Sequence, residues 1–125
     1  MATVTPTLTL VSADALVDKL NLTVTNSLTI TGDAIYGSAV MATGSDFTLS
    51  PKGSPVNTYV YMKNMSTDNT AKTGSAENID VELGSVNVAL LGPGEFLFLP
   101  WTGETALNMR STSSTPTLEY AIFEL

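Results

Sequence analysis

The chain has 125 residues, 43% of them hydrophobic and only 14% charged, with a formal net charge of −7. Its five cations are too few to neutralise a phosphate backbone or an anionic membrane surface, so we expect no nucleic-acid and no membrane partner. The absence of His and Cys removes the commonest general base, the commonest transition-metal ligand and any disulfide. We therefore expect no enzyme, no metal and no cofactor, and assembly in a reducing cytoplasm.

A Thr-rich segment opens the chain. Residues 1–11 alternate Thr with apolar residues, and Pro6 interrupts the pattern. This composition predicts an extended N-terminal arm that adds a strand to a neighbouring chain by main-chain pairing. Residues 12–125 are expected to form one domain. The first part of that domain, residues 12–20, fits either a short helix or a bulged strand.

Alternating apolar and polar residues recur through the rest of the chain, which is the pattern of half-buried strands. Gly84 and Ser85 separate two such segments and predict a tight hairpin, and Gly37 predicts a bend or bulge inside another. The most polar stretch, residues 64–75, is predicted to be an exposed loop. The predicted strands cover residues 21–31, 34–42, 46–49, 56–63, 79–83, 86–90, 105–110 and 117–125.

A further strand is predicted over residues 95–101, after the turn formed by Gly92, Pro93 and Gly94. Both faces of this strand are apolar, so either it lies inside a sandwich or another chain covers one face. Pro100 cannot donate a ladder hydrogen bond and predicts a strand end or a sheet edge. One face carries Phe96 and Phe98, and the other carries Leu97, Leu99 and Trp101.

Roughly eight to ten short strands at this spacing predict an all-β fold, an antiparallel sandwich or barrel. The last strand, residues 117–125, is also apolar on both faces and should be packed rather than frayed. Two strands with two apolar faces predict a homo-oligomer whose interface uses one of those faces.

No constellation of side chains predicts catalysis. Asp68-Asn69-Thr70 offers oxygen ligands, but it lacks the alternating acidic pattern of a calcium loop, and turn capping explains it as well. Paired carboxylates can hydrolyse glycosides, but Glu95, Glu119 and Glu124 are better explained as structural groups paired with Arg110 or a Lys.

Two further motifs have a structural explanation beside a functional one. Trp101, Tyr59 and Tyr61 could stack on a sugar, but Trp and Tyr also anchor cores and interfaces, and the sequence favours that explanation. Gly92-x-Gly94 is not followed by Lys-Ser/Thr and a helix, so it predicts no phosphate loop.

Four segments carry a resemblance to a known family: Tyr59–Asn64, Ser66–Thr70, Leu91–Pro100 and Leu118–Glu124. In their order and spacing they resemble small virion structural proteins of tailed bacteriophages, including those of cyanobacteria. Within that group they resemble capsid decoration (cement) proteins and related fibre and knob pieces. The resemblance covers the C-terminal half well and the Thr-rich arm loosely.

The resemblance implies a jelly-roll-like β-sandwich, a trimer on the virion surface, and no catalytic residue. The implied function is a decoration protein that bridges subunits of the major capsid protein and so stabilises the head. The alternative is a receptor- or carbohydrate-binding module of a head or tail fibre, which a groove of exposed aromatic side chains would favour. Oligomer or capsid contacts are expected at Thr7, Leu8, Leu10, Leu97, Leu99, Trp101, Phe123 and Leu125.

Overall fold

The computed structural model describes every residue except 15–18, 51–56, 68–76 and 112–113. The described part of the chain is all-β, with 65% of the residues in strands and no helix, so it contains no helix that could span a membrane. All ladders between the strands are antiparallel, which confirms the predicted fold class. The chain divides into two compact units, residues 1–31 with Leu125 and residues 32–124.

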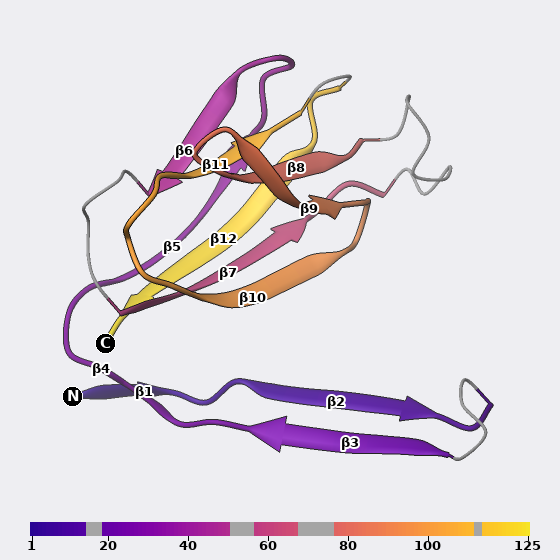
Figure 1. Cartoon of the computed structure of the whole chain (residues 1–125), viewed down its shortest axis with the longest axis vertical. Coiled ribbons are helices and arrows are strands. Elements are labelled where there is room, and N and C mark those ends of the chain that lie inside the picture. The colour runs from indigo at the N-terminus through magenta and orange to yellow at the C-terminus, as the bar shows by residue number, and fades with distance from the viewer. Residues whose placement is uncertain (15–18, 51–56, 68–76, 112–113) are drawn as a thin grey trace. The chain divides into compact units, whose positions relative to one another are not determined.

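The first unit is a two-stranded antiparallel ribbon (Figure 1). We call its strands together the ribbon. Its outer ladder joins β1 (Ala2–Val4) to β4 (Leu28–Ile30), and its longer ladder joins β2 (Thr7–Ser12) to β3 (Leu20–Thr25).

The ribbon accounts for most of the Thr-rich sequence. Pro6 interrupts the strands as predicted, but the ribbon continues across the break because the Asn26 N–H donates to the Pro6 carbonyl oxygen at 3.2 Å. The single strand predicted over residues 21–31 is therefore two strands. The division between the units follows Thr31, later than the boundary drawn after residue 11, because residues 7–12 find their partner strand within the first unit.

The alternatives for residues 12–20 are only partly tested. Ser12 and Leu20 form the last pair of the β2–β3 ladder, so both ends of the segment are strand. Residues 15–18 lie outside the described residues, as do the calcium-loop candidate Asp68-Asn69-Thr70 and most of the loop predicted over residues 64–75.

The second unit contains two four-stranded sheets (Figure 1). The β7 sheet has the order β10 (Phe96–Trp101), β7 (Thr58–Asn64), β12 (Thr117–Glu124) and β5 (Ala34–Val40). The β8 sheet has the order β6 (Asp46–Ser50), β11 (Leu107–Arg110), β8 (Ile79–Leu83) and β9 (Val86–Leu91).

The strand pairs of this unit are nested. β8 pairs with β9, β7 with β10, β6 with β11, and β5 with β12. The chain doubles back at the β8–β9 hairpin, where Gly84 has a φ of 65° and confirms the predicted turn. Two more ladders, β7–β12 and β8–β11, join the nested pairs into the two sheets.

The two sheets pack face to face around one core, to which both contribute. This arrangement buries alternate residues along β7 and β11, as the period of two requires. Leu97, Leu99 and Tyr120 pack against the edge of the core. Its fully or nearly buried members are Met41, Leu49, Val60, Met62, Ile79, Val81, Leu91, Trp101, Leu107, Met109, Leu118 and Ile122.

The pairing of β10, whose two faces are both apolar, shows which of these faces points into the core. Leu97 and Leu99 pair with Met62 and Val60 of β7, so they share the inner face of the sheet. β10 is the outermost strand of its sheet, which confirms the edge predicted from Pro100. Its outer face therefore carries Phe96 and Phe98.

Gly37 serves a different purpose from the one predicted. The β5–β12 ladder runs through it without a register shift, so the predicted bulge is wrong. A Cβ atom at Gly37 would lie 2.8 Å from the Tyr120 hydroxyl oxygen. The glycine therefore makes room for a partly buried ring. The register shifts occur elsewhere, between Val81 and Glu82 and between Leu107 and Asn108.

Candidate functional site

The outer surface of the β7 sheet carries most of the aromatic residues of the chain. The sequence has one Trp, four Tyr and four Phe, and six of these nine side chains alternate with core residues on the four strands of this sheet. They therefore point away from the core. We call this surface the aromatic face, made of Tyr36, Tyr59, Tyr61, Phe96, Phe98 and Phe123.

Cross-strand pairing brings the rings together. Tyr61 lies opposite both Phe98 and Ala121, and Ala121 in turn lies opposite Tyr36. The rings of Tyr59 and Phe98 stack, with centroids 5.3 Å apart and planes 24° apart. Ala121 is buried although it lies on the outer surface, because aromatic side chains flank it on both sides. The six rings thus form one continuous surface.

A carboxylate lies within this surface. The Tyr36 hydroxyl donates to Glu119 Oε2 at 2.9 Å, and the Tyr61 hydroxyl donates to Glu119 Oε1 at 3.1 Å. Lys63 is the cross-strand neighbour of Glu119 on β7. The two tyrosines come from strands on either side of Glu119, so the cluster holds three strands together through side chains.

The cluster changes how both tyrosines ionise. The hydrogen bond to Glu119 and its negative charge raise the pKa of Tyr36. Burial raises the pKa of Tyr61, and the hydrogen bond and charge of Glu119 add to the effect. Because the folded-state pKa values lie above the ordinary value, these contacts stabilise the fold below about pH 10 and are lost as the pH rises through the folded pKa values.

A Glu119→Gln variant should therefore lower the pH at which two of the four tyrosines ionise. Glutamine keeps the shape of the side chain and an acceptor oxygen but removes the charge that opposes tyrosinate formation. Tyrosinate absorbance across an alkaline titration measures the midpoints. Glu104→Gln, at an exposed residue outside the cluster, is the control and should leave the curve unchanged. Identical curves for the wild type and Glu119→Gln would contradict the assigned contacts.

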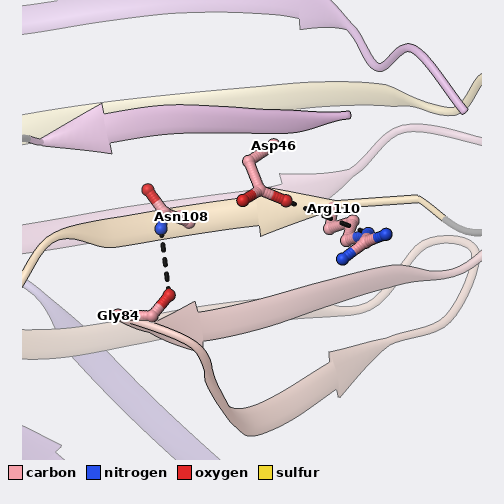
Figure 2. A network of polar contacts seen from close by, with 4 residues as sticks. All are labelled: Asp46, Gly84, Asn108 and Arg110. Atoms are coloured by element: carbon pink, nitrogen blue, oxygen red, sulfur yellow. Dashed lines mark hydrogen bonds and ion pairs between the residues drawn. The ribbon is translucent and has the colours of Figure 1, made fainter. Parts of the chain in front are cut away.

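The outer surface of the β8 sheet differs in character, because its alternate residues are mostly polar. Figure 2 shows the Asn108 amide nitrogen donating to the Gly84 carbonyl oxygen at 3.0 Å. The same view shows Arg110 beside Asp46, with Arg110 Nε and Asp46 Oδ1 3.9 Å apart. In the described residues no group of three or more acidic side chains could hold a metal ion.

The three glutamates flagged in the sequence are not held by Arg110. The Glu124 carboxylate accepts the Asp33 N–H at 3.1 Å, and the Glu95 carboxylate accepts the Gly92 N–H at 2.9 Å. Glu119 is held by the two tyrosines. Arg110 contacts Asp46 instead, so the predicted pairing with a glutamate is wrong for this arginine.

The structure distributes the predicted contact residues among different surroundings. Thr7, Leu8 and Leu10 lie exposed on β2 of the ribbon. Leu97, Leu99 and Trp101 face the core, while Phe96 and Phe98 lie on the outer face of β10. Phe123 belongs to the aromatic face, and Leu125 is grouped with the first unit.

The sugar-stacking trio of Trp101, Tyr59 and Tyr61 is not assembled, because Trp101 lies in the core and the tyrosines face outward. Tyr36 and Phe96 are the two most exposed rings of the aromatic face, at 72% and 59%, and neither was among the contact residues predicted from the sequence. Only the alignment of four strands brings them together. No family model matches this chain, and a search of curated proteins finds no relative of it.

Proposed function

We propose that the protein is a non-enzymatic virion structural protein, a capsid decoration protein that attaches to the shell through the aromatic face. The observation that carries this proposal is the concentration of six aromatic side chains on one outer sheet surface. Aromatic residues are enriched at the centres of protein interfaces, where each ring buries a large area with little loss of side-chain freedom.

The composition of the aromatic face suits a protein partner. The charged residues that lie among its rings are Lys63 and Glu119, and Glu119 is held by two tyrosine hydroxyls. Polar groups that already have partners within the sheet need no new ones from the shell when water is removed. The surface is therefore ready to be buried against a largely apolar patch.

The order of the strands also supports the proposal. Nested pairing of eight strands, with the β7 sheet taking β5, β7, β10 and β12 and the β8 sheet taking the others, is the connectivity expected of a jelly roll. We infer that the second unit is a jelly-roll sandwich. Jelly rolls occur in viral capsid proteins and in lectins, so this inference suits both an attachment protein and a sugar-binding one.

The direct test is whether the protein is present in virions encoded by the same genome that encodes this chain. Mass spectrometry and cryo-electron microscopy of purified particles should find it on the head, in a fixed ratio to the major capsid protein. Its absence from particles would overturn the proposal.

A rebinding experiment tests the surface. Heads stripped of the protein should rebind the wild type, while a Phe96→Ser/Tyr36→Ser variant should bind at least about tenfold more weakly, the loss expected from about 1.4 kcal/mol. The matched control is Val86→Ser/Val88→Ser, which changes two apolar β9 residues of similar exposure, 63% and 51%, in the other sheet. Equal binding by all three proteins would exclude the aromatic face as the attachment surface.

One observation favours a second candidate, a carbohydrate-binding module. Tyr36, Tyr61 and Glu119 combine ring faces with a carboxylate and hydroxyls, which are the groups that hold sugars. Binding of host-surface polysaccharide by the purified protein, weakened by Glu119→Gln and with no rebinding to stripped heads, would favour this candidate over the first.

A further inference from the structure

The ribbon has two faces of different chemistry. The β2–β3 register places Leu8 opposite Val24 and Leu10 opposite Leu22, and antiparallel partners share a face. We call these four side chains the apolar face of the ribbon. The other face is rich in threonine and includes the pairs Thr7–Thr25 and Thr9–Thr23.

The threonine face is suited to water. The Thr7 and Thr25 hydroxyl oxygens lie 3.2 Å apart across the ladder, within hydrogen-bond distance. Threonine is β-branched and favours strands, and its hydroxyl remains hydrated on an open surface. This face therefore needs no further cover.

The apolar face does need cover. Its four side chains are between 42% and 52% exposed, and the described part of the first unit is a single layer with no third strand. An isolated two-stranded hairpin is marginally stable in water, and a further layer over its apolar face is what makes such a hairpin stable. Something must pack on this face if the ribbon is to persist.

The distribution of charge indicates what packs there. The four strands of the ribbon contain no charged residue. Only two of the twelve acidic residues and one of the five cations lie in residues 1–31, all between positions 14 and 19. A chain with a net charge of −7 repels its own copies over most of its sequence, and this repulsion is weakest along the ribbon.

We infer that the apolar face of the ribbon packs against the apolar face of the ribbon of a second copy of this chain. A charged partner could form no ion pair with these strands, because they carry no charge. An identical face can instead pack its leucine and valine side chains against the same residue types. The same four side chains occur on both sides, which is the requirement for a symmetric interface between identical subunits. Contact occurs through side chains, because these four side chains project from a face of the ribbon and not from its edges.

This inference concerns a surface separate from the aromatic face. It replaces main-chain addition to a neighbouring sheet, which the sequence predicted for residues 1–11, with packing of one ribbon on another. If the protein self-assembles but does not bind heads, this inference holds and the proposed attachment through the aromatic face is wrong. A monomer that binds heads would do the reverse.

The test compares charges placed on two adjacent cross-strand pairs of the ribbon, one on each of its faces. Sedimentation velocity of the full chain at micromolar concentration should give a mass that is a multiple of 13.1 kDa. Leu10→Glu/Leu22→Glu should reduce it to the mass of one chain, because four carboxylates would then meet in the interface. Thr9→Glu/Thr23→Glu, the matched control on the opposite face, should keep the wild-type mass.

A second variant separates loss of contact from loss of the ribbon itself. Leu10→Thr/Leu22→Thr keeps strand-forming side chains but removes apolar area, and it should also dissociate the assembly. Circular dichroism should show the same strand content in all variants. A wild type that sediments as one chain would overturn the inference, since the ribbon then packs within its own chain. An assembly that survives both leucine variants would overturn it as well.

Discussion

A Trp101→Ala variant should lose about 3–5 kcal/mol of unfolding free energy, the range for removing a large aromatic side chain from a core. Trp101 is 4% exposed and belongs to the core cluster between the sheets. Urea denaturation followed by circular dichroism measures the change. The variant should have a lower midpoint with a similar slope, as expected when a cavity is created without a change in the surface exposed on unfolding.

Phe96→Ala is the matched control because it lies on the same strand, faces the other way and is 59% exposed. Its unfolding free energy should change by less than about 1 kcal/mol, as is usual at surface positions. The pair distinguishes a core residue from an interface residue on one strand. If Trp101→Ala changed the assembly and left the stability of the chain intact, Trp101 would be an interface residue, as the sequence alone led us to expect.

An Asn64→Ala variant should lose about 2–4 kcal/mol, since each buried polar group left without a partner costs about 1–3 kcal/mol. The buried Asn64 side chain donates to the carbonyl oxygens of Glu77 and Leu91, and its Oδ1 atom accepts the Ser66 N–H at 3.0 Å. Its backbone N–H donates to the Glu95 carbonyl oxygen at 3.0 Å. Asn64 therefore connects the end of β7 to segments on both sides of the β8–β9 hairpin.

Asn87→Ala provides the comparison, because Asn87 is an exposed residue of β9. Thermal and urea unfolding should place this control within about 0.5 kcal/mol of the wild type. Asn64→Asp should be no more stable than Asn64→Ala, since it removes the donor and adds a charge at a buried position. A wild-type midpoint for Asn64→Ala would show that its hydrogen bonds add nothing to stability.

The burial of Asn64 differs from what its sequence neighbourhood predicts. Its polar neighbours suggested an exposed loop that began at residue 64, but the structure buries it as the last residue of β7. The two-residue period of the strand indicates this burial. The buried residues Thr58, Val60 and Met62 alternate along β7, and Asn64 is the next residue on the same face. A polar residue in phase with a buried face should have been expected to satisfy backbone groups there.

The sequence predicted the strands and turns of the sandwich well. The turn at residues 92–94 marked the start of β10, Gly84 marked the hairpin, and Pro100 marked an edge, because these signals depend on local backbone geometry. The choice of inner face on β10 could not be predicted, since Leu97 and Phe96 are about equally apolar. Only the pairing with β7, far away in the sequence, decides which of them meets the core.

The candidate site was harder to predict for the same reason. Tyr36, Tyr61 and Glu119 are separated in sequence and belong to three strands, and no spacing rule connects them. The ribbon was not predicted for another reason. The alternation over residues 21–31 correctly indicates strands, but it does not indicate which other strand they pair with. Local pairing with residues 7–12 takes these residues out of the sandwich.

The nested pairing has a consequence for how the chain folds during its synthesis. β5 is an edge strand of the β7 sheet and pairs there only with β12, which comes last in chain order among the described strands. The β8–β9 hairpin, by contrast, joins neighbours in the sequence and closes at little entropic cost. We expect folding to proceed outward from this hairpin, so that β5 lacks its partner strand until residues 117–124 emerge. The time spent in that state is when the nascent chain is most exposed to aggregation and to chaperones.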